Sequence, residues 1–502
     1  MKIKKILVAN RGEIAIRVMR SARELGISTV AVYSEADAML PHASYADEAI
    51  NIGEATATMS YLNQEKIIDA CKQTGANAIH PGYGFLSENA SFAKRVEEEG
   101  LIFIGPSPEA ISIMGDKLTS KQTVAKYNVP LVPGMAEPIS DVEVAKKVAD
   151  EIGYPVMIKA SAGGGGKGMR IVHEPGSFTD QMERAMSEAK NSFGNDEVFV
   201  EKFIGSPKHI EVQVLGDQHG NVVHLFEREC SIQRRHQKVV EEAPSALLSP
   251  EKREEIGEAA KRVAKSCQYY GAGTVEFIAD ENFDFYFLEM NTRLQVEHPV
   301  TELITGVDLV KEQIKIAEGQ KLSFLQKDLQ IHGHSVEIRV YAEDPANNFL
   351  PDTGVLKRYQ RPQGAGIRVD DGYEEGLEVG IHYDPMIAKL ITYGKDRQEA
   401  IARMLRAIHE YKIAGINTTL PFCKFVLQHP TFIDGTFTTK FVETYFDENA
   451  LVEDIPEEAL EAAFVAAFHH FEKEKKKLMP KKNLQASSKN TDNLWRNRKH
   501  LS

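Results

Sequence analysis

The chain has 502 residues, enough for roughly two to four structural units around a large buried core. Hydrophobic residues make up 42% of it and charged residues 26%, the usual balance of a soluble globular protein. The formal net charge of −13 argues against nucleic-acid binding, and the sequence has no signal-peptide pattern and no run of about eighteen apolar residues. We therefore expect a cytoplasmic protein that binds neither nucleic acid nor a membrane.

The first predicted unit covers residues 1–114 and alternates strand patterns with helix patterns. The segments KILVAN, GEIAIRVMRSARELG and STVAVYS indicate strand, helix and strand, and NAIHPGYG, ENASFAKRVEEEG and LIFIGPS repeat that order. Such alternation predicts a parallel sheet covered by helices. The segment HPGYGFLSEN, from His80, is typical of a loop after a parallel strand, which is either a site loop or a purely structural one.

The second predicted unit, residues 115–330, holds a glycine-rich segment, IKASAGGGGKGMRIV, that begins at Ile158. Glycines let backbone N–H groups approach phosphate oxygens closely. The run MRIV indicates a strand after the glycines, which excludes a dinucleotide-binding motif, and the Ser or Thr that a P-loop requires is missing. We expect a hairpin with Lys159 before its loop and Lys167 inside it, which either covers a phosphate or is only a flexible surface loop.

The same unit contains two apolar runs, TVEFI and FYFLEMN, joined by the turn-like ADENFD. If these runs pair as an antiparallel hairpin, Glu276 and Glu289 lie nearly opposite each other, and Asn291 shares a face with Glu289. Two carboxylates and an amide on one surface are oxygen ligands that suit Mg2+. Directly after them come Arg293, Glu297 and His298. The arginine is a candidate anion binder, and the other two residues are the candidates for a base.

A densely basic run, CSIQRRHQKVVEEAP, begins at Cys230. It is either a solvated strand face or the anion-binding wall of the cleft that holds the expected metal and the glycine-rich loop. The residues that would form such a wall are Gln233, Arg234, Arg235, His236 and Lys238.

The third predicted unit, residues 331–446, mixes strands with a helix over the segment DRQEAIARMLRAIHEY. In VEIRVYAED, Arg339 alternates with apolar residues, and a buried arginine must be paired because an unpaired buried charge is costly. Arg339 therefore either has a role in the site or forms a salt bridge with Glu337, Glu343 or Asp344.

The last segment, residues 447–502, has a different composition. Residues 447–461 carry seven acidic and no basic residues, whereas residues 472–502 carry ten Lys or Arg and three acidic residues. Between them an apolar stripe recurs at helical spacing, formed by Leu460, Phe464, Phe468 and Phe471. We expect an amphipathic helix and a partly disordered basic tail, which either packs on its own body or docks on a partner subunit.

Taken together, these strings resemble the biotin carboxylases of the ATP-grasp superfamily, from about residue 3 to residue 446. The shared strings are VANRGEIA, HPGYGFLSEN, MGDK, IKASAGGGGKGMR, RRHQKVVEEAP, EMNTRLQVEHPVTE and EIRVYAEDP, in this order. The resemblance implies an α/β and α+β multidomain fold. Its parts are a Rossmann-like α/β domain (1–114), an ATP-grasp domain with a mobile Gly-rich lid (115–330, lid about 131–203), a C-terminal biotin carboxylase domain (331–446) and the tail (447–502).

The resemblance also implies roles for individual residues. Those expected to bind ATP are Lys117, Lys159, Gly165, Gly166, Glu201, Lys202, Phe203, Ile204, His209, Gln233 and His236. Those expected to hold magnesium are Glu276, Glu289 and Asn291. Lys238, Arg293 and the Val296 N–H would bind bicarbonate, Glu297 would take its proton, and Arg339 would stabilise the biotin enolate.

The implied activity is carboxylation of biotin by bicarbonate with Mg-ATP, with Mn2+ as an alternative ion, through carboxyphosphate. The sequence has no Ala-Met-Lys-Met or Met-Lys-Met string for biotin attachment. We therefore expect two partners, a biotin carboxyl carrier protein and a carboxyltransferase subunit, and a homodimer within the complex. The final acceptor would be an acyl-CoA such as acetyl-CoA or propionyl-CoA. The alternatives are another ATP-grasp ligase, of the carbamoyl-phosphate or purine-pathway type, and an inactive ATP-binding scaffold.

Overall fold

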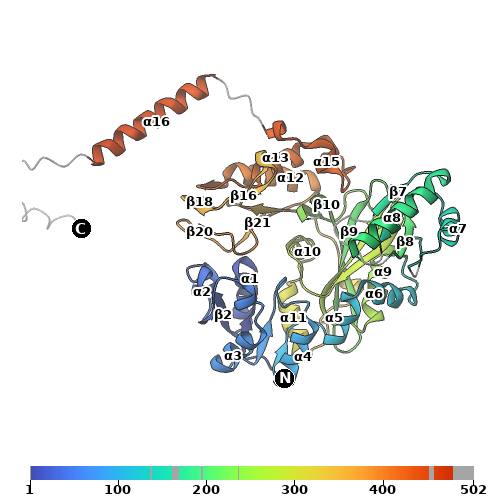
Figure 1. The fold of residues 1–502 in the computed structure, drawn as a ribbon. Helices are drawn as coiled ribbons and strands as arrows, with labels where there is room; N and C mark the ends of the chain where they lie inside the picture. Colours follow the sequence, from blue (N-terminus) through green and yellow to red (C-terminus); the bar gives the residue numbers. More distant parts are fainter. Residues whose placement is uncertain are drawn as a thin grey trace, which may run out of the picture. The chain divides into compact units, whose positions relative to one another are not determined.

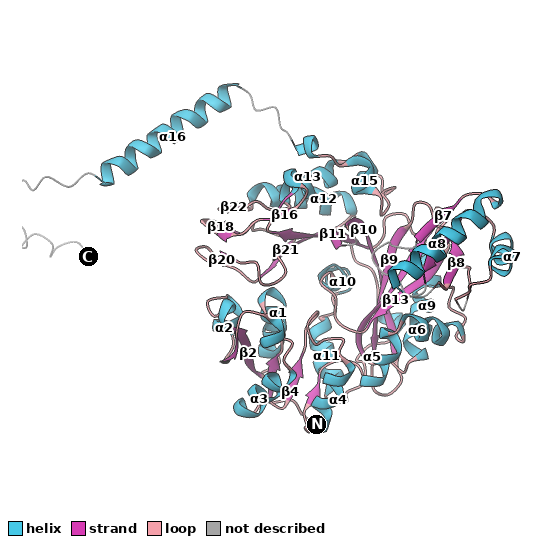
Figure 2. Cartoon of the chain, viewed as in Figure 1, coloured by secondary structure: helices cyan, strands magenta, loops and turns pink. Residues whose placement is uncertain are grey.

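The computed structural model describes residues 2–135, 138–160, 169–193, 196–235, 237–451 and 457–478 (Figures 1 and 2). The chain divides into two compact units, Met1–Leu451 and Val452–Ser502. The predicted domain boundaries inside the first unit stay predictions.

The first unit begins with a five-stranded parallel sheet in the order β3-β2-β1-β4-β5, as the strand–helix alternation predicts. The segment HPGYGFLSEN begins at the last residue of β4 and forms the loop between β4 and α4. The strands are β1 (Lys5–Val8), β2 (Ser28–Ser34), β3 (Glu48–Gly53), β4 (Ala78–His80) and β5 (Ile102–Phe103). The helices are α1 (Gly12–Glu24), α2 (Pro41–Tyr45), α3 (Gln64–Thr74), α4 (Ala90–Glu98) and α5 (Pro108–Gly115), with 3-10 turns η1 (Glu35–Asp37) and η2 (Ala57–Met59).

A small antiparallel sheet in the order β7-β6-β8 lies beneath two helices and carries the glycine-rich segment. Strands on both sides of that segment confirm the predicted hairpin, whereas its loop, residues 161–168, lies outside the described residues. The elements are β6 (Val156–Ala160), β7 (Met169–Val172), β8 (Val198–Lys202), α7 (Val142–Ile152), α8 (Phe178–Phe193) and the 3-10 turn η3 (Pro175–Ser177).

An eight-stranded sheet in the order β13-β12-β9-β10-β11-β14-β21-β19 forms the centre of the unit. Antiparallel pairing of β11 with β14 joins the predicted ATP-grasp and C-terminal domains in one sheet. The strands are β9 (Lys208–Gly216), β10 (Val222–Arg234), β11 (Gln237–Ala243), β12 (Gly271–Ala279), β13 (Phe285–Asn291), β14 (His334–Tyr341), β19 (Ile367–Asp371) and β21 (Met386–Gly394). The helices in this part of the chain are α6 (Lys117–Ala125), α9 (Pro250–Ser266), α10 (His298–Thr305) and α11 (Leu309–Ala317), with the 3-10 turn η4 (Gln326–Asp328).

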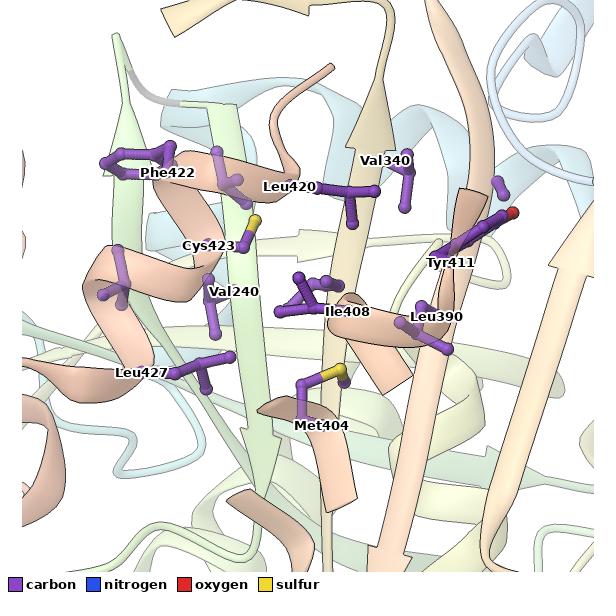
Figure 3. Close-up of a cluster of buried hydrophobic side chains, with 14 of the residues drawn as sticks. Val240, Val340, Leu390, Met404, Ile408, Tyr411, Leu420, Phe422, Cys423 and Leu427 are labelled. Atoms are coloured by element: carbon purple, nitrogen blue, oxygen red, sulfur yellow. The ribbon is translucent and has the colours of Figure 1, made fainter. Parts of the chain in front are cut away.

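The C-terminal part of the first unit packs helices on one face of this sheet. Figure 3 shows the resulting core, where Val240, Val340 and Leu390 from the strands meet Met404 and Ile408 of α12. The predicted helix is confirmed, and it begins where Asp396 caps it by accepting the Glu399 N–H. The helices are α12 (Arg397–Glu410), α13 (Leu420–Gln428), α14 (Pro430–Ile433) and α15 (Phe441–Tyr445), with 3-10 turns η5 (Pro345–Asn347) and η6 (Glu448–Leu451). The short strands are β15 (Glu343–Asp344), β16 (Leu350–Pro351), β17 (Gly354–Val355), β18 (Arg358–Gln360), β20 (Glu378–Val379) and β22 (Lys412–Ala414).

The second unit contains one described helix, α16 (Glu457–Leu478), as the apolar stripe predicts. Its phenylalanines are exposed, with 75% of Phe464, 68% of Phe468 and 63% of Phe471 open to solvent, so no described residue of this unit covers the apolar face. The predicted disordered tail lies outside the described residues. Among the helices that the structure describes, none is both long and apolar enough to cross a membrane.

Candidate active site

The hairpin of β12 and β13 places its acidic residues as the alternation of its side chains predicts. Glu276 faces Glu289 across the two strands, and Thr274 faces Asn291. The Asn291 side chain donates a hydrogen bond from Nδ2 to Glu276 Oε1 over 2.9 Å. The residues proposed to hold a metal therefore lie together at one end of the central sheet.

Lys238, on β11, lies among three carboxylates. Its ammonium group donates to Glu276 Oε1 over 2.9 Å and to Glu297 Oε1 over 2.6 Å, and it also contacts Glu211 Oε2. Burial alone would lower the pKa of Lys238, but the carboxylates outweigh it and raise the pKa well above its usual value. Lys238 is therefore a permanent buried cation at the centre of the site.

Glu297, just before helix α10, is held by two cations. Lys238 contacts one oxygen, and the other accepts a hydrogen bond from Arg339 Nη2 over 2.9 Å. Burial would raise the pKa of Glu297, but Lys238 and Arg339 outweigh it and hold the pKa well below its usual range. Glu297 is therefore an ionised carboxylate that can accept a proton once these contacts loosen.

Arg339 is paired in a way that the sequence does not predict. Its Nε donates to Glu241 Oε1 over 2.6 Å, in addition to the contact with Glu297. The suggested salt bridges to Glu337, Glu343 or Asp344 are wrong: Glu343 instead accepts from Arg234 over 2.7 Å. The reason is the strand register, because β11 lies beside β14 and brings Glu241 to Arg339 from nearly a hundred residues away.

The sequence reasoning also missed Arg228, which is fully buried on β10. Its guanidinium fixes Glu211 and Gln295, and Gln295 Nε2 in turn donates to Glu276 Oε1 over 2.8 Å. The available signal was the charged triplet Glu227, Arg228 and Glu229 between the apolar ends of the segment VVHLFERECSI, which a buried strand can hold only if the charges are paired. The groups to which Arg228 donates belong to Glu211, Gln213, Thr274, Gln295 and Thr301.

Arg293 connects the N-terminal sheet to the site. Its Nε donates to Glu88 Oε2 over 2.7 Å, and its Nη2 donates to Asn291 Oδ1 over 3.2 Å. Glu88 belongs to HPGYGFLSEN, so this segment contacts the candidate site through Arg293. His298, in contrast, is fully buried with its Nδ1 2.7 Å from the Gln295 carbonyl, and burial, followed by the charge of Lys389, holds its pKa well below the usual value. Glu297 therefore remains the candidate base.

The carboxylates on β12 and β13 fit a magnesium ion. Burial, and next the charge of Glu276, raise the pKa of Glu289, and the Glu289 carboxylate has no hydrogen bond or ion pair within the described part of the chain. A cation would keep both carboxylates ionised, and an oxygen-rich set suits Mg2+. His209 Nε2 lies 3.0 Å from Glu276 Oε2, and ligand atoms of His209, Glu211 and Glu276 gather within 4.8 Å of one another.

Several of the residues proposed for ATP binding lie on α6 and on the small sheet of β6, β7 and β8. Glu201 accepts hydrogen bonds from Lys121 over 2.8 Å and from Lys159 over 2.6 Å, so two lysines meet where the small sheet joins α6. Lys117 begins α6 and its charge acts on Glu289. Lys202 instead turns its ammonium group to the Gly153 carbonyl over 2.8 Å. The predicted residues that lie outside the described ones are Gly165, Gly166 and His236.

A cavity of about 960 Å³ opens next to His209 and is large enough for a nucleoside. Apolar side chains from the hairpin and from α15 line it, with polar groups at its edge. The lining residues include His209, Gln233, Ile278, Leu288, Lys440 and Phe446. Phe203 and Ile204 are half-buried, and the Phe203 ring lies 5.9 Å from the Lys440 ammonium group, at the same edge.

The network around Arg228 predicts a large stability effect. The variant R228M leaves Glu211 buried without its guanidinium partner, so we expect the free energy of unfolding to fall by about 3 kcal/mol. Urea unfolding followed by circular dichroism measures this change. The exposed Arg358 offers a matched control, since R358M should change the stability by less than about 0.5 kcal/mol. Equal stability of the two variants would contradict the role given to Arg228.

The ion pairs of Glu297 predict a pH dependence. A glutamate in an unfolded chain titrates at about pH 4.3, and the pKa of Glu297 in the folded protein lies well below that value. The stabilisation is therefore complete above about pH 4.3 and is lost as the pH falls toward the folded value. We expect E297Q to be less stable than the wild type by about 2 kcal/mol near neutral pH, with a difference that shrinks below about pH 4. Urea titrations that show a constant difference down to that range would rule this out.

Comparisons with known proteins agree with this geometry. Three family models match the chain: the biotin carboxylase N-terminal domain over residues 2–111, the ATP-binding domain of the carbamoyl-phosphate synthase L chain over residues 116–325, and the biotin carboxylase C-terminal domain over residues 337–444. The ATP-binding model is flanked on both sides by biotin carboxylase models, so the match as a whole does not favour a carbamoyl-phosphate synthetase.

Similar proteins carry related names. The chain is 54% identical to biotin carboxylase 1 of Bacillus subtilis over 88% of its own length and 99% of that protein. It is 54% identical to a pyruvate carboxylase subunit of Methanothermobacter thermautotrophicus, over 88% of the chain and 90% of the relative. A solved neighbour is the biotin carboxylase domain dimer of Hydrogenobacter thermophilus 2-oxoglutarate carboxylase with MgADP, ADP and bicarbonate, at 49% identity and a TM-score of 0.80, over 91% of this chain and all of that one. The chain belongs to the biotin carboxylase family.

Proposed function

We propose that the chain catalyses the Mg-ATP-dependent carboxylation of biotin by bicarbonate, the first half-reaction of an acyl-CoA carboxylase. The observation that carries this proposal is the Glu297 carboxylate, held between Lys238 and Arg339 and adjoining the acidic pair Glu276 and Glu289. A base, fixed cations and a metal site in one buried cluster suit proton removal and phosphoryl transfer. A base, fixed cations and a bound metal are the groups that an enzyme needs to activate a small anion with ATP.

The residues around Glu297 are proposed to bind and deprotonate bicarbonate. Lys238 and Arg293 attract the anion, and the Val296 N–H, which has no partner within the described residues, can donate to one of its oxygens. When a bicarbonate oxygen accepts a hydrogen bond from Lys238, Glu297 loses part of the contact that holds its pKa low. Binding of the substrate itself therefore makes Glu297 a better base for the bicarbonate hydroxyl.

ATP is proposed to lie with its base in the 960 Å³ cavity and its phosphates toward Lys117, Lys159 and the glycine-rich loop. Glu276, Glu289 and Asn291 would hold magnesium, which would supply positive charge to neutralise the phosphates. A deprotonated bicarbonate oxygen attacks the γ-phosphorus, the bond to ADP breaks, and carboxyphosphate forms. Carboxyphosphate divides into CO2 and phosphate, the phosphate takes the biotin ureido proton, and the enolate, stabilised by Arg339, attacks CO2.

The partners follow from this proposal. Biotin would reach the site on a biotin carboxyl carrier protein, and a carboxyltransferase subunit would pass the carboxyl group to acetyl-CoA or propionyl-CoA. The relative named as a subunit of pyruvate carboxylase supports action within a multi-subunit enzyme, and the Hydrogenobacter domain dimer supports a homodimer.

ATP cleavage tests the proposal directly. With Mg2+ and bicarbonate, we expect free biotin to stimulate ATP cleavage by the purified chain, because biotin consumes the CO2 formed in the site. E297A should lose the bicarbonate-dependent cleavage by about a hundredfold or more, since no base remains. R339A should retain a slow biotin-independent cleavage and lose the stimulation. Cleavage that ignores biotin but requires an amine would instead identify another ATP-grasp ligase, and no cleavage at all an inactive scaffold.

We further propose that α16 docks on the carrier or transferase subunit. Trimming after Leu451 removes α16 and preserves Asp447 and Asn449, which line the cavity. The trimmed chain should keep its activity on free biotin and lose most co-purification with its partner, because the exposed phenylalanines of α16 are gone.

A full-length pair of variants separates apolar docking from simple shortening. F464S/F468S removes exposed apolar side chains, and H469S/H470S changes exposed polar ones on the same helix. Only the first pair should weaken co-purification. Equal complex formation by the trimmed and complete chains would reject the docking proposal.

A further inference from the structure

Two buried glutamates next to Arg339 have no place in the chemistry above. Glu241 on β11 and Glu337 on β14 stand directly opposite each other in the antiparallel pair, and they are 1% and 0% exposed. Side chains opposite each other on neighbouring strands share one face, with Cβ atoms about 5 Å apart. The two side chains therefore lie side by side on one face of the sheet, close enough for the charge of Glu241 to act on Glu337.

Hydrogen bonding in this pair is incomplete. Glu241 Oε1 accepts from Arg339, but Glu241 Oε2 and both oxygens of Glu337 are buried without a hydrogen-bond partner in the described parts of the chain. Buried carboxyl oxygens rarely lack a partner in folded proteins. A proton on Glu337 supplies the missing bond, because a carboxylic acid can donate to the free oxygen of the opposite carboxylate.

The surrounding charges also leave no cation for an ionised Glu337. On β21, Lys389 is fully buried, donates to the Val296 carbonyl over 2.8 Å and lies 3.2 Å from Glu13. Arg339 is already shared by Glu241 and Glu297. Helix α10 contributes Glu297 at its start and the buried His298, and α12 packs apolar side chains on the opposite face of the sheet. An ionised Glu337 would add an unpaired negative charge, which is strongly disfavoured at full burial.

We propose that Glu241 and Glu337 share one proton, and that neutral Glu337 is a positioning residue that holds Glu241 against Arg339. The shared proton orients the Glu241 carboxylate, which in turn fixes the guanidinium that reaches Glu297 and, under the proposed function, the biotin enolate. It also limits the negative charge beside Arg339 to that of Glu241 and Glu297, so that the guanidinium can still attract an anion.

Burial, opposed by Lys389 and reinforced by Glu241, raises the pKa of Glu337 well above its usual value. Loss of this proton at high pH would place a second negative charge against Glu241 and pull the guanidinium away from the substrate. We therefore expect biotin-dependent turnover to decline on the alkaline side.

Three variants test the proposal by kinetics. E337Q keeps a neutral hydrogen-bond donor and should retain most of the biotin-dependent rate without the alkaline decline. E337L removes the donor and should lower the kcat for biotin carboxylation by about tenfold or more while leaving the KM for ATP unchanged. E229Q is the matched control, since Glu229 is a buried glutamate of the neighbouring strand that contacts Ser231 and Ser245 and not Arg339. It should keep the wild-type pH profile.

Infrared spectroscopy gives a readout that does not depend on activity or on the proposed function. The wild type should show a carbonyl stretch of a protonated carboxyl group that shifts in D2O and is missing from E337Q but present in E229Q. A wild-type spectrum without that band overturns the proposal, whether or not the chain carboxylates biotin or E337L folds. An E337Q variant as slow as E337L also overturns the proposal, because the proposal predicts that a neutral hydrogen-bond donor at this position maintains the rate.

Discussion

The ammonium group of Lys238 lies among the carboxylates of Glu211, Glu276 and Glu297, and the rest of the site depends on this arrangement. Three buried carboxylates without a shared cation would repel one another and the site would open. Two of them are also fixed from outside, since Arg228 holds Glu211 and Arg339 holds Glu297. In this alternation of charges, an anion that approaches Lys238 must compete with contacts that the ammonium group already makes.

The strands that carry these charges are held in register by apolar side chains on the opposite face of the sheet. Val240, Ile338 and Leu390 pack into the apolar core that α12 and α13 cover, where Figure 3 shows Val240 and Leu390. The residues next to them along the strands lie on the opposite face, which is the face of the site. A slip of one residue would turn the polar face into that core, so the core fixes the position of Glu241 and Arg339. The apolar face thus fixes the register of the strands, and the opposite face carries both the candidate site and the buried charge network around Arg228.

The sequence was sufficient for interactions that lie within one hairpin or one helix. The period of two places Glu276 opposite Glu289, and the apolar spacing finds α12 and α16. It was not sufficient for pairs that form between distant strands or loops, because their register is set by packing of the whole sheet. The contacts missed for this reason join Glu88 to Arg293 and Glu241 to Arg339. Arg228 and Glu211 face each other across the consecutive strands β9 and β10, where a register shift between His224 and Glu227 changes the pairing that a simple alternation would give.

The central claim is that the Glu297 cluster activates bicarbonate to attack ATP, and transfer of an oxygen isotope tests it most directly. Bicarbonate labelled with 18O is supplied with ATP and biotin, and the phosphate released is analysed by mass spectrometry. Attack by a bicarbonate oxygen on the γ-phosphorus predicts one 18O atom in each phosphate formed. Unlabelled phosphate would mean that water or another nucleophile attacks ATP, and would contradict the account.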